Sequence, residues 1–339
     1  MANSTLTRDN LFQLNCLIWA SFPQPVGAPV TPVLRNAGYA LFRIEQPLDA
    51  SVAELARFRE TSAALQIQPN PVVDVVFHNT KNNTYTLTEC KPSSFGVDSE
   101  WSPQARGLIV AGGNLSSRLG VGGKPAGELC YLVPEEDVQS VDATLIELCN
   151  QVGGLSFITC PTGPFGLSIK EDGIYIGLLN PPKGTAQMPL KFVPEQKVLE
   201  IEPGQDPRPL YVIPWIPDVQ DDTDLEFFKE KVRIYVLGQL GKAPIGGQVT
   251  LSFEELLDEV SRGVFRHWRD RDSLIGRVFP MVGKLISILF RDDTRVKITR
   301  RETKVTLNSE ADREELMEKV RIAGLPQKLP QGVQLTMDE

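Results

Sequence analysis

The sequence has little histidine and no paired-cysteine pattern. Its 339 residues include two histidines, His78 and His267, and five cysteines without a Cys-x-x-Cys spacing. A histidine-rich zinc site is therefore excluded, as is any mechanism that needs two neighbouring histidines and a cysteine. An uneven number of scattered cysteines is typical of a reducing compartment, so we expect a cytoplasmic protein without structural disulfides.

Long apolar runs are also missing. No stretch approaches the roughly 18 apolar residues that predict a membrane-spanning helix. The first ten residues contain an acid and are not followed by the apolar core of a signal peptide. We therefore expect no association with a membrane.

Positive charge is in deficit across the chain as a whole. The 35 lysines and arginines are outnumbered by 43 acids, which gives a formal net charge of −8. The overall field does not favour a nucleic acid, so any contact with DNA must come from a local basic patch.

The strongest functional signal lies in residues 71–91. Two runs rich in Val, Phe, Tyr, Leu and Thr flank a polar centre at residues 79–83, which is the composition of a β-hairpin. The first run carries Asp74, and the second ends in Glu89-Cys90-Lys91. Alternate residues of a strand share a face, so Glu89 and Lys91 point the same way. Two registers are open: Asp74 lies opposite Glu89 in one and opposite Lys91 in the other, and both place all three side chains on one face.

These residue types suit metal-assisted chemistry on a phosphate. Directly opposed residues have Cβ atoms about 4.5–5.5 Å apart, and two carboxylates at that separation repel unless a cation lies between them. Mg²⁺ takes oxygen ligands from one or two carboxylates and keeps several waters. Lys91 could orient or deprotonate the attacking water, or stabilise charge that develops on the phosphate. The pattern predicts a Mg²⁺ (or Mn²⁺) site at Asp74 and Glu89, with a solvated hairpin face as the alternative.

The segment Pro71-Val-Val-Asp74, a gap of fourteen residues and then Glu89-Cys90-Lys91 resembles the motif of the PD-(D/E)xK nuclease superfamily. The resemblance covers roughly residues 40–160. It implies a restriction-endonuclease-like mixed sheet flanked by helices, with Asp74 and Glu89 as metal ligands and Lys91 assisting the attacking water. The family's adjacent Pro-Asp pair is interrupted here by two valines.

A helix is expected soon after Lys91, with Ser102 as its N-cap and Pro103 at its first position. Gln104 then lies in the first turn, close to the end of the strand that carries Lys91. RecB-like members of the resembled family have a glutamine on this helix, followed four residues later by a tyrosine, where this chain has Leu108. Gln104 is therefore a fourth candidate catalytic residue.

A second helix is expected before the hairpin, from Asp49 to about Gln66. In the resembled family such a helix often contributes another acid. Glu54 and Glu60 are the candidates here, and two solvated surface acids are the alternative.

The expected elements from residue 39 onward alternate as strand, helix, strand, strand, helix, strand and helix. This order predicts an α/β nuclease-like domain over residues 1–153, with a mixed sheet between helices. Short strands separated by turns and prolines predict a small β-rich appendage or a linker over residues 154–217. Residues 218–339 are expected to form a helical C-terminal domain.

The C-terminal domain carries a basic island. Its expected order of two helices and a hairpin resembles a winged-helix module, on element order alone. Residues 262–304 contain twelve lysines and arginines against five acids, as contact with phosphates would require. The alternative is a mixed-charge helical surface with ion pairs four residues apart. The candidate DNA-binding residues are Lys284, Arg295, Lys297, Arg300, Arg301 and Lys304.

Three functional hypotheses follow. The first is a metal-dependent DNA endonuclease, a class that the resemblance associates with bacterial restriction or anti-phage defence. The second is a catalytically inactive nuclease fold that serves as a scaffold in a larger complex. The third is a winged-helix DNA-binding protein. DNA is the expected partner, and a homodimer or a partner subunit remains open.

Overall fold

The computed structural model describes residues 3–23, 28–61, 64–177, 195–202, 204–215, 222–268, 271–291 and 293–323. The chain divides into two compact units. Unit 1 comprises residues 1–214 together with 264–271, and unit 2 comprises residues 215–263 together with 272–339.

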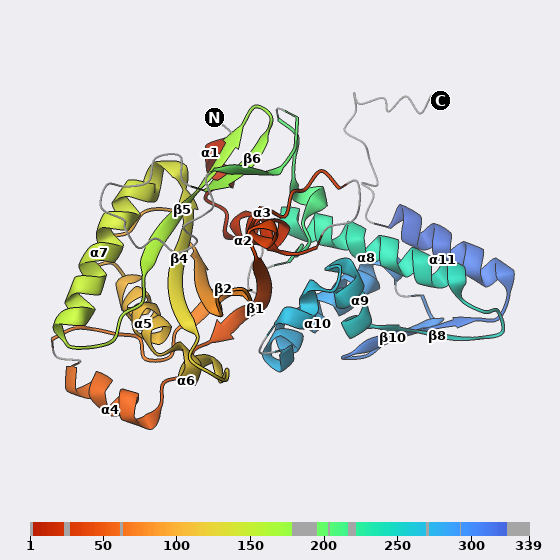
Figure 1. The fold of residues 1–339 in the computed structure, drawn as a ribbon. Coiled ribbons are helices and arrows are strands. Elements are labelled where there is room, and N and C mark those ends of the chain that lie inside the picture. The colour runs from red at the N-terminus through yellow and green to blue at the C-terminus, as the bar shows by residue number, and fades with distance from the viewer. Residues whose placement is uncertain are drawn as a thin grey trace. The chain divides into compact units, whose positions relative to one another are not determined.

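Unit 1 is built on a mixed sheet whose described strands lie side by side in chain order (Figure 1). The central strands β3, β4 and β5 are parallel, and the neighbouring pairs on both sides are antiparallel. The strands are β1 (Tyr39–Pro47), β2 (Val72–Asn79), β3 (Thr84–Cys90), β4 (Ala126–Pro134), β5 (Thr162–Lys170), β6 (Gly173–Gly177) and β7 (Gln196–Leu199).

Helices flank this sheet (Figure 1). One buried cluster joins apolar residues of α4, α5 and α7 to those of β2, β3 and β4, and α2 contacts β1, β2 and β3. The α5 helix packs very close to β4 where two glycines meet. A Cβ atom added to Gly127 would lie only 2.1 Å from the Gly112 carbonyl oxygen, so a larger residue would not fit at this position. The helices are α1 (Asn3–Leu6), α2 (Asn10–Ser21), α3 (Val33–Asn36), α4 (Val52–Thr61), α5 (Ser102–Gly113), α6 (Leu115–Leu119) and α7 (Val138–Gly154), with the 3-10 turns η1 (Glu135–Asp137), η2 (Arg208–Leu210) and η3 (Val264–His267).

The predicted α/β character with a mixed sheet is confirmed, but the compact units do not follow the predicted boundaries. Residues 154–217 were expected to be an appendage or a linker, whereas β5, β6 and β7 within them extend the main sheet. The physical reason is that β5 pairs in parallel with β4, from Leu129 opposite Thr162 to Pro134 opposite Leu167, so the backbone hydrogen bonding continues without a break.

Unit 2 combines helices with a small antiparallel sheet in the order β8-β10-β9. The α9 helix starts with a side-chain cap, in which the Ser252 hydroxyl accepts the Glu255 N–H. Within the described residues no helix is both long and apolar enough to cross a bilayer. The elements are α8 (Asp222–Lys242), β8 (Gly247–Ser252), α9 (Phe253–Val260), α10 (Arg271–Phe290), β9 (Val296–Ile298), β10 (Glu302–Leu307) and α11 (Glu310–Ile322).

Candidate active site

The hairpin of β2 and β3 brings the two candidate acids together. The strands are antiparallel, with Val75 opposite Thr88. The same register continued by one residue places Asp74 opposite Glu89, which is one of the two registers that the sequence allows. The Asp74 backbone N–H donates to Glu89 Oε2 at 3.3 Å, and the Cys90 N–H donates to Asp74 Oδ2 at 2.7 Å. The backbone of each strand thus holds the carboxylate of the other.

Lys91 and Gln104 form one hydrogen-bonded cluster with Glu89. Lys91 Nζ lies 3.1 Å from Glu89 Oε1 and 3.1 Å from Gln104 Oε1. Gln104 Nε2 donates to the same Glu89 oxygen at 2.9 Å and to the Val72 carbonyl oxygen at 3.1 Å. The predicted catalytic residues Asp74, Glu89, Lys91 and Gln104 therefore meet at one end of the hairpin, beside the start of α5.

The two carboxyl groups are held in surroundings that disfavour their charged forms. Glu89 is 3% exposed and Lys91 is 8% exposed, while Asp74 and Gln104 are half-buried. Burial, together with the Glu89 charge, raises the pKa of Asp74 to about 8, although the Cys90 N–H and Lys91 act in the opposite direction. Burial also raises the pKa of Glu89, against the lowering effect of Lys91. Both shifts favour a proton on the carboxylate pair, and a bound cation would take the place of that proton.

The backbone at Lys91 is fixed from two sides. Its N–H donates to the Leu132 carbonyl oxygen on β4 at 2.9 Å. Gln13 on α2 is fully buried, and its Nε2 donates to the carbonyl oxygens of Lys91 and Thr7, each at 2.8 Å. Sequence analysis missed Gln13. The available signal was a polar amide inside the otherwise apolar run Leu11-Phe12-Gln13-Leu14.

A third acid lies in the same row of the sheet, on β1. Ile44 is opposite Val75, and Gln46 is opposite Val73, so Glu45 is opposite Asp74. The Glu45 charge adds to the causes that raise the pKa of Asp74. Glu45 also has a φ of 46°, which non-glycine residues rarely adopt. Sequence analysis missed this acid, because nothing local shows that β1 pairs with β2 in this register.

The acids expected from the preceding helix lie elsewhere. Glu54 accepts the Ser51 N–H at 2.9 Å, and its other oxygen lies 3.3 Å from Arg118 Nε, in a pair that is largely buried. These contacts give Glu54 a structural role at the start of α4. Glu60 is exposed on the same helix.

The donor set of the hairpin limits which ion it suits. Among the described residues, no three or more His, Cys, Asp or Glu side chains are grouped so that they could hold a metal ion together. Asp74 and Glu89 therefore offer a pair of carboxylates without nitrogen or sulfur ligands. Such a pair fits a hard divalent ion that keeps part of its water shell, such as Mg²⁺ or Mn²⁺, and does not fit zinc in a closed structural site.

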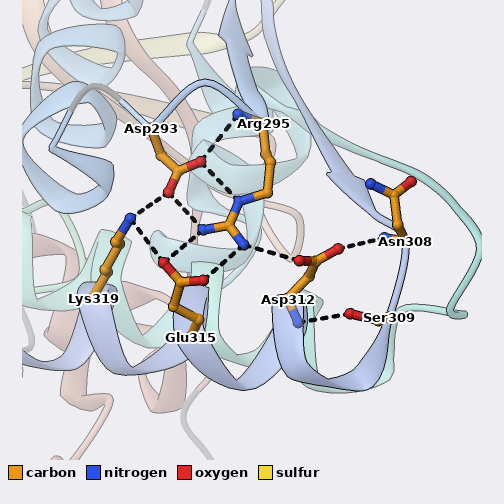
Figure 2. A network of polar contacts seen from close by, with 7 residues as sticks. All are labelled: Asp293, Arg295, Asn308, Ser309, Asp312, Glu315 and Lys319. Atoms are coloured by element: carbon orange, nitrogen blue, oxygen red, sulfur yellow. Dashed lines mark hydrogen bonds and ion pairs between the residues drawn. The ribbon is translucent and has the colours of Figure 1, made fainter.

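In unit 2, the predicted DNA-binding residue Arg295 is engaged within the protein. Figure 2 shows its guanidinium between three acids, with nitrogen–oxygen distances of 2.7 Å to Asp293, 3.2 Å to Asp312 and 3.0 Å to Glu315. Lys319 joins the cluster at 2.5 Å from Asp293. These contacts strongly lower the pKa of Asp293, chiefly through its hydrogen bonds to Arg295. The cluster fastens the segment before β9 to α11.

The other predicted basic residues lie closer to solvent. Lys297 on β9 and Lys304 on β10 are directly opposed, and Lys304 pairs with Glu302 at 3.0 Å. Arg300 and Arg301 occupy the turn between these strands and are exposed. Lys284 is exposed on α10. The exposed candidates for contact with a phosphate backbone are therefore Lys284, Lys297, Arg300 and Arg301.

Comparison with protein-family models, with curated proteins and with solved structures finds no match to this chain.

Proposed function

We propose that this protein is a divalent-metal-dependent endonuclease that hydrolyses phosphodiester bonds of DNA. The observation that carries the proposal is the convergence of Asp74, Glu89, Lys91 and Gln104 at one end of the hairpin, with Glu89 Oε1 accepting from both Lys91 and Gln104. Its support is chemical: a buried carboxylate pair with raised pKa values beside a fixed ammonium is an arrangement that functional sites use and cores avoid.

Each side chain has a role that follows from its contacts. Asp74 and Glu89 would hold the ion, which when bound supplies Lewis-acid polarisation of the phosphodiester. Lys91 pairs with Glu89 Oε1 and directs a second N–H at Gln104 Oε1, and this position suits stabilisation of negative charge on the phosphorus oxygens. Gln104 links Lys91, Glu89 and the Val72 carbonyl oxygen, and so keeps the ammonium and the carboxylate in one arrangement.

The test is nicking of supercoiled plasmid DNA with Mg²⁺ or Mn²⁺, and with EDTA as the metal-free control. We expect metal-dependent nicking by the wild type and losses of about 10²-fold or more in Asp74→Asn, Glu89→Gln and Lys91→Met. Glu60→Gln removes an exposed acid of unit 1 and should retain full activity. Full activity in this control, beside the losses in the three site variants purified in the same way, would assign the nicking to the hairpin site rather than to a contaminating nuclease. Intact plasmid with both ions, together with no metal binding by calorimetry, would refute the proposal and leave the scaffold hypothesis.

A second candidate function, DNA binding by unit 2, has an observation of its own. Its elements follow the order α8, β8, α9, α10, β9, β10, with the sheet order β8-β10-β9, and this resembles a winged-helix module. Exposed basic residues lie on the hairpin of β9 and β10, where they could contact a phosphate backbone. Binding through phosphate contacts weakens when salt is added.

For this function we expect salt-dependent DNA binding that falls in Arg300→Glu/Arg301→Glu, with the salt slope reduced by about 2. The matched control is Arg321→Glu, an exposed basic residue of α11 whose partner is Glu318. Equal loss of binding in the control would show that net charge, rather than the hairpin, governs the interaction.

A further inference from the structure

The residue that starts α5 is unusual for its position. The helix begins one residue earlier than its sequence predicts, so that Trp101 and not Ser102 is the N-cap residue. Ser, Thr, Asp or Asn is normally preferred at this position, and the Trp101 side chain makes no capping hydrogen bond. The turn before the helix is closed by Ser102 instead, whose hydroxyl donates to the Gly96 carbonyl oxygen at 2.7 Å and whose N–H donates to the Ser99 carbonyl oxygen at 3.1 Å. The indole ring is therefore available for another contact.

That contact is with the ammonium of the candidate active site. Lys91 Nζ lies 5.2 Å from the centroid of the Trp101 ring, within the range of a cation–π interaction. An ammonium has three N–H donors, and Lys91 directs two of them at Glu89 and Gln104. Because Lys91 is only 8% exposed, water competes weakly for the remaining side, and the negative face of the ring compensates part of the lost hydration.

The ring itself is held by the sheet. Phe95 contacts it edge-on, with centroids 6.0 Å apart and planes at 75°. Phe95 is 6% exposed and rests on Tyr131 of β4 at a centroid distance of 5.5 Å. The Trp101 carbonyl oxygen accepts the Ala105 N–H at 3.0 Å, which anchors the same residue in the first turn of α5. The ring position is thus tied to the strand next to the one that carries Lys91.

We propose that Trp101 is a positioning residue of the active site, whose ring holds the Lys91 ammonium in place beside Glu89 and Gln104. The catalytic consequence rests on the proposed nuclease function, whereas the contact itself belongs to the folded protein and can be tested without activity. The negative face of the ring attracts the ammonium and so favours the position of Lys91 beside Glu89 and Gln104.

The first arm of the test is a double-mutant cycle. Trp101→Leu and Trp101→Phe are made in the wild type and in Lys91→Met, which keeps the length of the side chain and removes its charge. The readout is hydrogen-exchange protection of peptides that contain the Lys91 amide, which reports on unit 1. We expect Trp101→Leu to lower protection roughly 2- to 30-fold more with Lys91 than with methionine, the range of one cation–π contact. Equal losses in both backgrounds would overturn the proposal.

Trp101→Phe is the milder substitution and can be measured even if Trp101→Leu does not fold. Phenylalanine keeps an aromatic face and should retain part of the coupling to Lys91. Should Trp101→Leu fail to fold, the cycle is measured with Trp101→Phe alone, in the wild type and in Lys91→Met. The loss of exchange protection must again be larger in the background that keeps Lys91, and an equal loss in both backgrounds contradicts the contact.

The second arm measures nicking kinetics. We expect Trp101→Leu to lower kcat on the order of tenfold with little change in KM, Trp101→Phe to restore most of it, and Trp101→Leu to have no further effect in Lys91→Met. A change in KM alone, or no rescue by phenylalanine, would contradict a role in positioning Lys91. If the wild type nicks no DNA, the proposed function fails, and the exchange cycle still decides whether the ring holds the ammonium.

Discussion

Binding of a divalent ion at the hairpin should release close to one proton per ion at pH 7. The pKa of Asp74 is raised to about 8 by burial and by the charge of Glu89. One pH unit below its pKa, an acid is about nine-tenths protonated, so at pH 7 about 0.9 proton must leave Asp74 when the ion binds. The apparent affinity should also weaken, approaching about tenfold for each pH unit below 8.

Calorimetric titration of Mn²⁺ in two buffers of different ionisation enthalpy measures the released protons directly. Wild-type protein should show a difference in apparent enthalpy that corresponds to about 0.9 proton at pH 7 and to much less at pH 9. Asp74→Asn should abolish the buffer dependence together with most of the binding, whereas the exposed control Glu60→Gln should retain both. Tight binding with no proton release at pH 7 would refute this account of the carboxylate pair.

Three further predictions follow from named contacts. Glu45→Gln removes one charge that raises the pKa of Asp74, so proton release at pH 7 should decrease, and an unchanged release would show that Glu45 does not act on Asp74. Arg295→Met removes the guanidinium that pairs with Asp293, Asp312 and Glu315, and leaves Lys319 on Asp293 and Glu315. This variant should destabilise unit 2 by about 1–3 kcal/mol in chemical unfolding, in contrast to Arg321→Met. Because Arg295 lowers the pKa of Asp293, this carboxyl stabilises unit 2 above its ordinary pKa near 4, and that stability should fall as the pH is lowered further. The loss should be weaker in Arg295→Met, measured by exchange protection of α11 peptides.

The hairpin and the meeting of Asp74, Glu89, Lys91 and Gln104 at its end could be predicted because the relevant information is local. Runs rich in β-branched and aromatic residues identify both strands. The two-residue period of a strand places Glu89 and Lys91 on one face whichever turn joins the strands. The register stayed open because the turn cannot be read from composition. Asn83 adopts a φ of 52° in the turn that joins the strands, and asparagine tolerates this conformation without being specific for it.

Long-range partners account for what the sequence did not show. Glu45 reaches the row of acids only through the pairing of β1 with β2, and Gln13 reaches the Lys91 carbonyl oxygen from a helix 78 positions away. Residues 154–217 were expected to be an appendage because no local pattern shows that β5 pairs in parallel with β4, a strand that lies some thirty residues earlier in the chain. Arg295 is basic like its neighbours, and only the folded chain reveals that Asp312 and Glu315 on α11 engage it.

The proposed function requires a divalent ion between the hairpin acids, and anomalous X-ray scattering from a Mn²⁺-soaked crystal would locate that ion. We expect an anomalous peak within coordination distance of carboxylate oxygens of both Asp74 and Glu89, and no such peak in Asp74→Asn. A crystal that takes up Mn²⁺ only elsewhere, with Lys91 still on Glu89 and no peak between the two acids, would contradict the proposed function.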